Sequence, residues 1–171
     1  MTRPEIRPDA DSADERAWLR RVVRLACDNA HAGQLPFAAL VVRDGTVLAT
    51  GVNTALRDND PTAHAEIAAI RTACGVVGDV YVTGATVVSS CEPCAMCHTV
   101  AAATGVERIL YAAPRELVPD LGHPAPPDIA ALATRMQDVL RATAPDQLVH
   151  VETDGADVPF ERYLLGRAGG C

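Results

Sequence analysis

The chain has 171 residues, 49% of them hydrophobic and 4% aromatic, with a formal net charge of −7, which predicts one globular domain with a sizeable core. An acidic chain without a basic run is a poor partner for phosphate backbones, so we expect a small-molecule partner and regard nucleic acid as disfavoured. The sequence shows neither a secretion signal nor an apolar run of about 18 residues, so we expect no membrane association and a cytoplasmic location.

A leader and a helix are the first predicted elements. Residues 1–11 are rich in Arg, Pro, Glu and Asp and lack periodicity, so we expect a disordered leader before a single domain over residues 12–171. Residues 12–15 form a capping-box pattern, Ser-Ala-Asp-Glu, that predicts the start of a helix. Apolar residues then recur at helical spacing until Gly33, which marks the end of that helix.

A hairpin and a polar connection follow this helix. The dipeptide Asp44-Gly45 separates apolar runs over 36–42 and 46–51, a pattern that predicts two antiparallel strands joined by a tight turn. Residues 51–60 are polar and turn-like, and they include Asn53. From the local sequence, Asn53 either closes a turn through its own side chain or presents its amide to a substrate's carbonyl and ring nitrogen.

The remaining elements alternate between helices and strands. They are a helix from Thr62 to about Gly75, a strand over 85–89, a helix over 94–104, a strand over 108–112, a helix over 129–143, a strand over 147–152 and a short helix over 160–166. A Pro-rich loop over 114–127, with Glu116, Asp120 and His123, could act as a lid. The alternation predicts an α/β sandwich whose last two strands are parallel, because a helix-length crossover joins them.

Two short motifs, His64-Ala65-Glu66 and Pro93-Cys94-Ala95-Met96-Cys97, have metal-ligand spacing. Residues two apart in mid-helix point about 200° away from each other, so His64 and Glu66 can face one metal only from the first turn of a helix. We expect Thr62 to be the N-cap that places this first turn. The two cysteines are neighbours on one helix face, and Pro93 suits the opening position of that helix.

The motifs predict two helix N-termini that converge on one metal ion, where the positive helix ends favour thiolates. A catalytic zinc has three protein ligands and an open fourth position, which His64, Cys94 and Cys97 would provide. The alternative is a closed structural site with Cys91 as a fourth ligand. Glu92-Pro93 separates Cys91 from the helix of the other cysteines, and a structural site has no use for a carboxylate beside the metal. We therefore predict a catalytic site.

The chemistry that these groups predict is hydrolytic deamination. Zinc acidifies a bound water to near-neutral pH, and Glu66 can take its proton and return it to a ring nitrogen and then to the departing amine. Attack on an amino-substituted, electron-poor ring carbon gives a tetrahedral species that collapses to a carbonyl and ammonia.

The sequence resembles the cytidine deaminase superfamily, whose HxE and PCxxC motifs it carries. Further segments are similar to bacterial guanine deaminases, and less similar to tRNA adenosine deaminases: 25–27, 35–39, Asn53, 59–67, 69–71 and 90–97. The resemblance covers residues 18–113. It implies a three-layer α/β/α cytidine deaminase-like sandwich with a five-stranded mixed sheet, and one zinc per chain on His64, Cys94 and Cys97. It also implies Glu66 as the proton shuttle and Asn53 as a substrate-binding amide.

Further expectations concern substrate binding and assembly. We predict Phe37 as the residue that stacks on the base and place Ala65 and Ser89, which adjoin the motifs, among the substrate-binding residues. The resemblance implies a homodimer, in which segment 145–171 can be swapped so that Tyr163, with Phe160 and Glu161, reaches the partner's pocket.

Guanine, converted with water to xanthine and ammonia in purine metabolism, is the substrate that the resemblance favours. Cytosine, pterins and s-triazines such as ammeline share the same amino-amidine edge and stay open as alternatives, because the C-terminal third matches less well. A tRNA adenosine deaminase is a further alternative, followed by a non-catalytic zinc-stabilised binding module.

Overall fold

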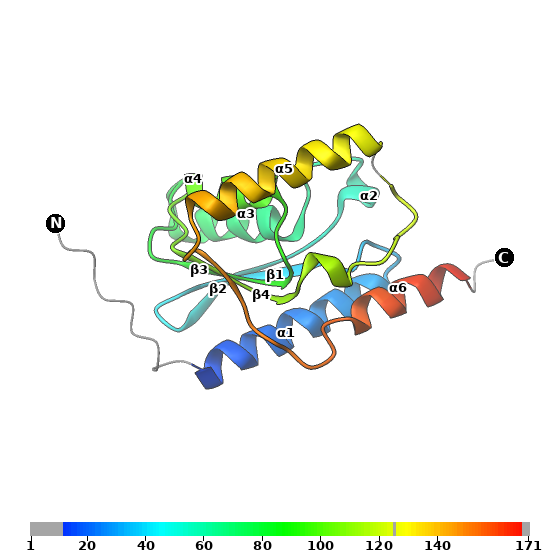
Figure 1. The fold of residues 1–171 in the computed structure, drawn as a ribbon. Coiled ribbons are helices and arrows are strands. Elements are labelled where there is room, and N and C mark those ends of the chain that lie inside the picture. The colour runs from blue at the N-terminus through cyan, green and yellow to red at the C-terminus, as the bar shows by residue number, and fades with distance from the viewer. Residues whose placement is uncertain (1–11, 125, 169–171) are drawn as a thin grey trace.

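The computed structural model describes residues 12–124 and 126–168, and its sheet lies between two layers of helices (Figure 1). The elements in chain order are α1 (Ser12–His31), β1 (Ala38–Arg43), β2 (Thr46–Val52), α2 (Ala55–Asp58), α3 (Ala65–Val77), β3 (Thr86–Cys91), α4 (Ala95–Ala103), β4 (Arg108–Ala113), the 3₁₀ turn η1 (Arg115–Leu117), α5 (Pro127–Thr143), β5 (Leu148–His150) and α6 (Val158–Ala168). Helices α1 and α6 cover one face of the sheet, and α3, α4 and α5 cover the other. The predicted leader, residues 1–11, lies outside the described residues.

The sheet has five strands in the order β2-β1-β3-β4-β5. Strand β1 runs antiparallel to both β2 and β3, whereas β3, β4 and β5 are mutually parallel. This topology confirms the predicted mixed sheet and the parallel pairing of its last two strands. It also places the C-terminal ends of β3 and β4 side by side. The segment with the zinc-motif cysteines follows β3 there, and the predicted Pro-rich loop follows β4.

The hairpin turn has the backbone geometry that its sequence predicts. Asp44 has φ = 51° and Gly45 has φ = 72°, the pair of positive values that a two-residue turn of the primed type requires. Strand β1 is buried along both faces because its side chains alternate between two clusters. Ala39 and Val41 pack with α3, whereas Leu40 and Val42 pack with α1.

Gly51 sets the distance between β2 and α3. A Cβ atom at this position would lie 2.3 Å from the carbonyl oxygen of Ala65 and 2.4 Å from the backbone nitrogen of Ala69. Only glycine permits this approach, because both contacts are with backbone that cannot rotate away. The first turn of α3 is thereby held against the sheet, which fixes the height of the residues at its N-terminus.

The starts of two helices differ from the prediction. Helix α3 begins at Ala65 with His64 as its N-cap residue, because Thr62 is engaged earlier: its hydroxyl donates to Asp60 Oδ1 at 2.7 Å. Cys94 is likewise the N-cap residue of α4, so Pro93 precedes that helix rather than opening it. Thr62 as N-cap and Pro93 as first helical residue were therefore wrong.

Other boundaries follow local backbone signals. Helix α3 continues through Gly75 to Val77 and ends at Gly78, whose φ of 74° allows it to cap the helix. The short helix α2 lies within the segment predicted to be a turn. Across residues 12–124 and 126–168, no helix combines the length and the apolar character that a membrane crossing requires.

The C-terminal helix α6 packs against α1 of the same chain (Figure 1). Its Phe160 is buried and lies with its ring centroid 5.9 Å from that of Phe37. In this arrangement α6 packs against α1 and Phe37 of its own chain. The exchange of segment 145–171 between subunits stays a prediction, and residues 169–171 lie outside the described residues.

Candidate metal centre

Three metal-ligating side chains converge where helices α3 and α4 begin. His64 precedes α3, Cys94 precedes α4, and Cys97 lies in the first turn of α4. His64 Nδ1 lies 3.6 Å from Cys94 Sγ and 3.5 Å from Cys97 Sγ, and the two sulfur atoms are 3.6 Å apart. All three atoms can therefore reach one central position.

These separations fit a tetrahedral zinc ion. Zinc binds sulfur at about 2.3 Å and nitrogen at about 2.0 Å, so tetrahedral ligands lie about 3.8 Å apart for two sulfurs and about 3.5 Å apart for sulfur and nitrogen. Each distance in the cluster is within about 0.2 Å of these values. Cys91 is not part of the cluster. The closed four-ligand alternative therefore lacks its fourth ligand, and one tetrahedral position is left for another molecule.

The protonation of the cluster also suits a cation. The hydrogen bond between the two cysteine sulfurs, and secondarily the one with His64, lowers the pKa of Cys94 to about 4. The hydrogen bond with Cys94 and burial raise the pKa of the neighbouring Cys97 thiol. One thiolate therefore forms at neutral pH, beside two helix N-termini whose dipoles favour negative charge.

Glu66 is the second residue of α3 and is buried beside the cluster. The Ser89 hydroxyl donates to its Oε1 atom at 2.8 Å and fixes the direction of the carboxylate. Burial raises the pKa of Glu66, which makes the carboxylate a better proton acceptor. The predicted proton shuttle thus lies beside the predicted metal ligands, with an orientation set by β3.

A cavity of about 390 Å³ opens onto this cluster. It is lined by Leu35, Phe37, Asn53, His64, Glu66, Cys91, Glu92, Cys94, Arg115 and Val118. Such a cavity, with mainly apolar walls and a few convergent polar groups, has the character of a small-molecule site. Phe37 forms part of one wall and is backed by Phe160.

Asn53 closes a turn through its own side chain, as one of the two interpretations from the sequence predicts, and its contact with a substrate stays a prediction. Its Oδ1 atom accepts a hydrogen bond from the Ala55 backbone N–H at 3.1 Å, which closes the local turn. Because the oxygen is the acceptor there, the amide nitrogen is the end of the side chain left to bind a ligand. Asn29 holds the Asn53 backbone by donating to its carbonyl oxygen at 2.8 Å. The buried amide is therefore fixed as a hydrogen-bond donor in the cavity wall.

The remaining predicted substrate-binding residues occupy different positions. Ala65 and Ser89 are buried next to the cluster, and Ser89 acts on Glu66 rather than lining the cavity. Tyr163 is buried on α6, and its hydroxyl lies 3.4 Å from His123 Nε2 and 3.2 Å from Arg167. It does not line this cavity within the single chain, and its predicted contact with substrate stays a prediction.

Glu92, Arg115 and Val118 line the cavity but were not predicted. Glu92 was interpreted only as a spacer between Cys91 and Pro93. Arg115 and Val118 belong to the predicted loop, without an assigned role. Arg115 lies two residues after the end of β4, the parallel neighbour of the strand that precedes the zinc motif, and ligands in such sheets bind outside the carboxyl ends of the strands. That position was the available signal.

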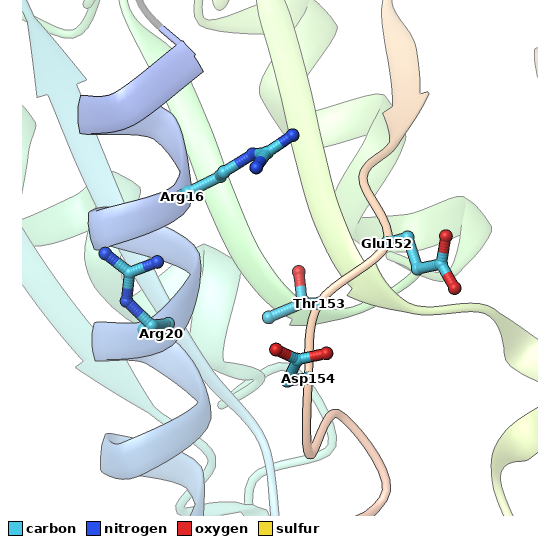
Figure 2. A pocket seen from close by; sticks show the side chains of 5 residues that line it. All are labelled: Arg16, Arg20, Glu152, Thr153 and Asp154. Carbon is cyan, nitrogen blue, oxygen red and sulfur yellow. The ribbon is translucent and has the colours of Figure 1, made fainter.

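A second cavity, of about 300 Å³, lies between α1 and the segment after β5 (Figure 2). It is lined by Arg16, Arg20, Glu152, Thr153 and Asp154. Two arginines and two carboxylates give this cavity a formal charge of zero, whereas His64 and Cys94 of the metal cluster line the other cavity. The chemistry of the protein is therefore assigned to the cavity above His64 and Cys94.

The fold and the site together define a class: three-layer α/β/α proteins with a His-Cys-Cys metal centre at two helix N-termini and a buried glutamate beside it. The chain belongs to the family described as the cytidine and deoxycytidylate deaminase zinc-binding region, whose model matches residues 12–113. Membership confirms the resemblance inferred from the sequence. It also identifies zinc as the cofactor of the cluster formed by His64, Cys94 and Cys97.

Different relatives of the chain are named for different substrates. The chain is 48% identical over 81 residues to the guanine deaminase of Bacillus subtilis and 40% identical over 80 residues to a tRNA-specific adenosine deaminase of Agrobacterium fabrum. Each match covers 47% of this chain and 52% or 53% of the relative, so the chain spans about half the length of these curated relatives. The crystal structure of the B. subtilis guanine deaminase aligns with a TM-score of 0.59 and 31% identity, covering 87% of this chain and 92% of that one.

Proposed function

We propose that this protein is a zinc-dependent hydrolytic deaminase of a free amino-substituted heterocyclic base, with guanine as the foremost substrate. The observation that carries this proposal is the buried Glu66 carboxylate beside three ligands that leave one metal position open to a cavity. In the reaction, water adds to the ring carbon that bears the amino group. The bond from that carbon to the amino nitrogen breaks, and guanine plus water becomes xanthine plus ammonia.

Bound zinc would supply Lewis-acid activation of water at neutral pH. Glu66 takes one proton from the attacking water on its carboxylate and passes it to the ring nitrogen. It then takes the second proton from the hydroxyl group now on the ring carbon and gives it to the amino group, which leaves as ammonia while the carbonyl forms. Ser89 keeps the carboxylate pointed at the reacting atoms through its 2.8 Å hydrogen bond. The raised pKa of Glu66 helps the carboxylate to accept the proton from water.

Two further residues would hold the base in place. The Asn53 amide nitrogen donates to an acceptor on the ring, since its oxygen is already used by Ala55. Phe37 provides an apolar face for stacking, and Phe160 keeps that ring from moving away. Asn53 and Phe37 both line the cavity, so they would position the ring carbon for attack.

Two observations favour a free base over tRNA. The match to a guanine deaminase is stronger than the match to a tRNA-specific adenosine deaminase, at 48% identity over 81 residues against 40% over 80 residues. The net charge of −7 also opposes association with a phosphate backbone. Cytosine, pterins and s-triazines remain substrates to be compared, and a cytoplasmic homodimer is the form in which we expect the protein to act.

The test is ammonia release from a panel of substrates by the zinc-loaded protein. The panel contains guanine, cytosine, a pterin, ammeline, guanosine, adenosine and tRNA. Turnover of guanine at the highest kcat/KM supports the proposal. Turnover of tRNA alone would refute it, and bound zinc with no ammonia from any substrate would favour a binding module instead.

A further inference from the structure

Arg115 is a charged residue in the cavity that the reaction itself does not use. It is the first residue of η1, two residues after the end of β4, and it lines the cavity together with His64 and Cys94. Strand β4 is the parallel neighbour of β3, which leads into the cysteine motif. The arginine therefore stands at the same edge of the sheet as the metal cluster.

Glu92, which lies between Cys91 and Pro93, fixes the backbone of Arg115. The Glu92 side chain is 1% exposed, and its Oε1 atom forms an ion pair with Arg141 of α5. Its Oε2 atom accepts the Arg115 backbone N–H at 3.4 Å. The turn is closed by a hydrogen bond of 3.0 Å from the Val118 N–H to the Arg115 carbonyl oxygen. Arg115 is thus tied to the zinc motif rather than to a freely moving loop.

The guanidinium of Arg115 forms none of the ion pairs found among the described residues, which involve Arg57, Arg108 and Arg141. The two carboxylates that line the cavity are already engaged, Glu66 by Ser89 and Glu92 by Arg141. A guanidinium has five N–H donors and no acceptor. Its natural partner in the cavity is a ligand edge with two adjacent hydrogen-bond acceptors.

We infer that Arg115 determines substrate specificity by binding the edge of a base that carries two neighbouring acceptors, an oxo group and a ring nitrogen. This inference rests on the proposed function. In guanine these acceptors are O6 and N7, which an arginine binds with two parallel hydrogen bonds. A purine with an amino group at position 6 presents a donor instead, which faces the guanidinium unfavourably. Arg115 therefore selects oxopurines over aminopurines.

The experiment compares Arg115→Met and Arg115→Lys with the wild-type protein on guanine and on 7-deazaguanine, which lacks the N7 acceptor. A bidentate contact contributes about 10–100-fold in discrimination, so Arg115→Met should lower kcat/KM for guanine by about that factor. The effect on 7-deazaguanine should stay within about threefold. Lysine keeps the charge without the planar fork, so Arg115→Lys should recover only part of the loss.

Equilibrium binding gives a second readout that is independent of turnover. Hypoxanthine has O6 and N7 but no amino group to lose, and unsubstituted purine lacks O6. Calorimetry should show hypoxanthine binding weakened about 10-fold or more by Arg115→Met, with purine little changed. Arg57→Met is the matched control, because Arg57 is exposed, pairs with Asp58 and lies outside the cavity.

The two readouts separate this inference from the proposed function. Wild-type inactivity on guanine, together with Arg115-dependent hypoxanthine binding, would refute guanine deamination and support the role of Arg115. Equal losses on guanine and 7-deazaguanine, with hypoxanthine binding unchanged, would overturn the inference. A larger loss of binding for guanosine monophosphate than for hypoxanthine would also overturn it, because the arginine would then be a phosphate ligand.

Discussion

The two parts of the molecule that meet at residue 113 differ in how deeply they are buried. In the zinc-site region, residues 12–113, strands β1, β3 and β4 are buried at nearly every position. In the C-terminal region, residues 114–124 and 126–168, β5 has no buried residue, and Gln137 is the one described residue of α5 that is buried. Helix α6 is the better packed part of this region, with Phe160 and Tyr163 buried. The family model matches the first region and ends where the second begins.

We propose that this difference gives the two regions partly separate tasks. Metal ligation and proton transfer need atoms held within a few tenths of an ångström, and a closely packed interior provides that. Choice of substrate depends on a few side chains at the rim, which can change without disturbing the core. Arg115 and Val118 are the residues that the C-terminal region adds to the cavity.

The largest expected effect is the loss of zinc from the zinc-site region. Cys97→Ala removes one of three ligands, so zinc content should fall from about one per chain to a small fraction and activity should fall with it. The matched control is Cys91→Ala, which removes a nearby buried cysteine that is not part of the cluster. Metal analysis of both variants should show zinc retained only in the control. Loss of zinc from both would place Cys91 among the ligands.

Substitution of Gly51 tests how rigidly β2 holds the start of α3. The added Cβ of Gly51→Ala would lie 2.3 Å from the Ala65 carbonyl oxygen, so the backbone must shift at a cost of about 3 kcal/mol. Gly75→Ala is the control, because nothing lies within 4 Å of a Cβ there, and it should stabilise the helix by about 0.5–1 kcal/mol. Chemical denaturation of the two variants should give opposite signs. A neutral Gly51→Ala would show that α3 is free to move.

A pair of identical substitutions compares the two regions directly. Val88 in β3 is 0% exposed, and Val88→Ala should lower the free energy of unfolding by about 2 kcal/mol. Val139 in α5 is 64% exposed, and Val139→Ala should change it by less than about 0.5 kcal/mol. Equal losses from the two variants, measured by urea unfolding, would mean that the exposed face of α5 is covered in solution.

The smallest effect is expected at the ion pair that joins the two regions. Arg141→Met leaves the buried Glu92 carboxylate without its cation, and the partial exposure of Arg141 limits the loss to about 1–2 kcal/mol. Adding Glu92→Gln should recover part of this loss, because no buried charge is then left unpaired. A double-mutant cycle measures the coupling energy. A coupling energy near zero would show that α5 and the zinc motif are independent.

Much of the fold could be predicted because its signals are local. The Asp44-Gly45 turn and the alternation of strands and helices are properties of neighbouring residues, and the structure confirms the hairpin and the parallel strands. The start of α3 was misplaced because Asp60 competes for the Thr62 hydroxyl. A single sequence does not show whether a Ser or Thr side chain bonds to the start of the following helix or to another polar side chain nearby.

The candidate site could be predicted in part, for a similar reason. The spacing within each motif predicts that His64 lies at the start of one helix and that Cys94 and Cys97 lie at the start of another. The structure brings all three together. Arg115 was missed because its place in the cavity depends on strand pairing and on the contact between its backbone and Glu92, which lie far apart in sequence. The predicted metal ligands thus lie in compact motifs, whereas the role proposed for Arg115 depends on tertiary contacts.

The most direct test of the account compares ammonia release from guanine by the zinc-loaded wild-type protein and its Glu66→Gln variant. Removing the proton shuttle should lower kcat by about 10²–10⁴-fold while zinc stays at one per chain, because glutamine keeps the shape of the side chain and the three ligands are unchanged. Glu66→Gln with full zinc and near wild-type turnover would contradict the central claim that this buried carboxylate carries the proton in hydrolytic deamination.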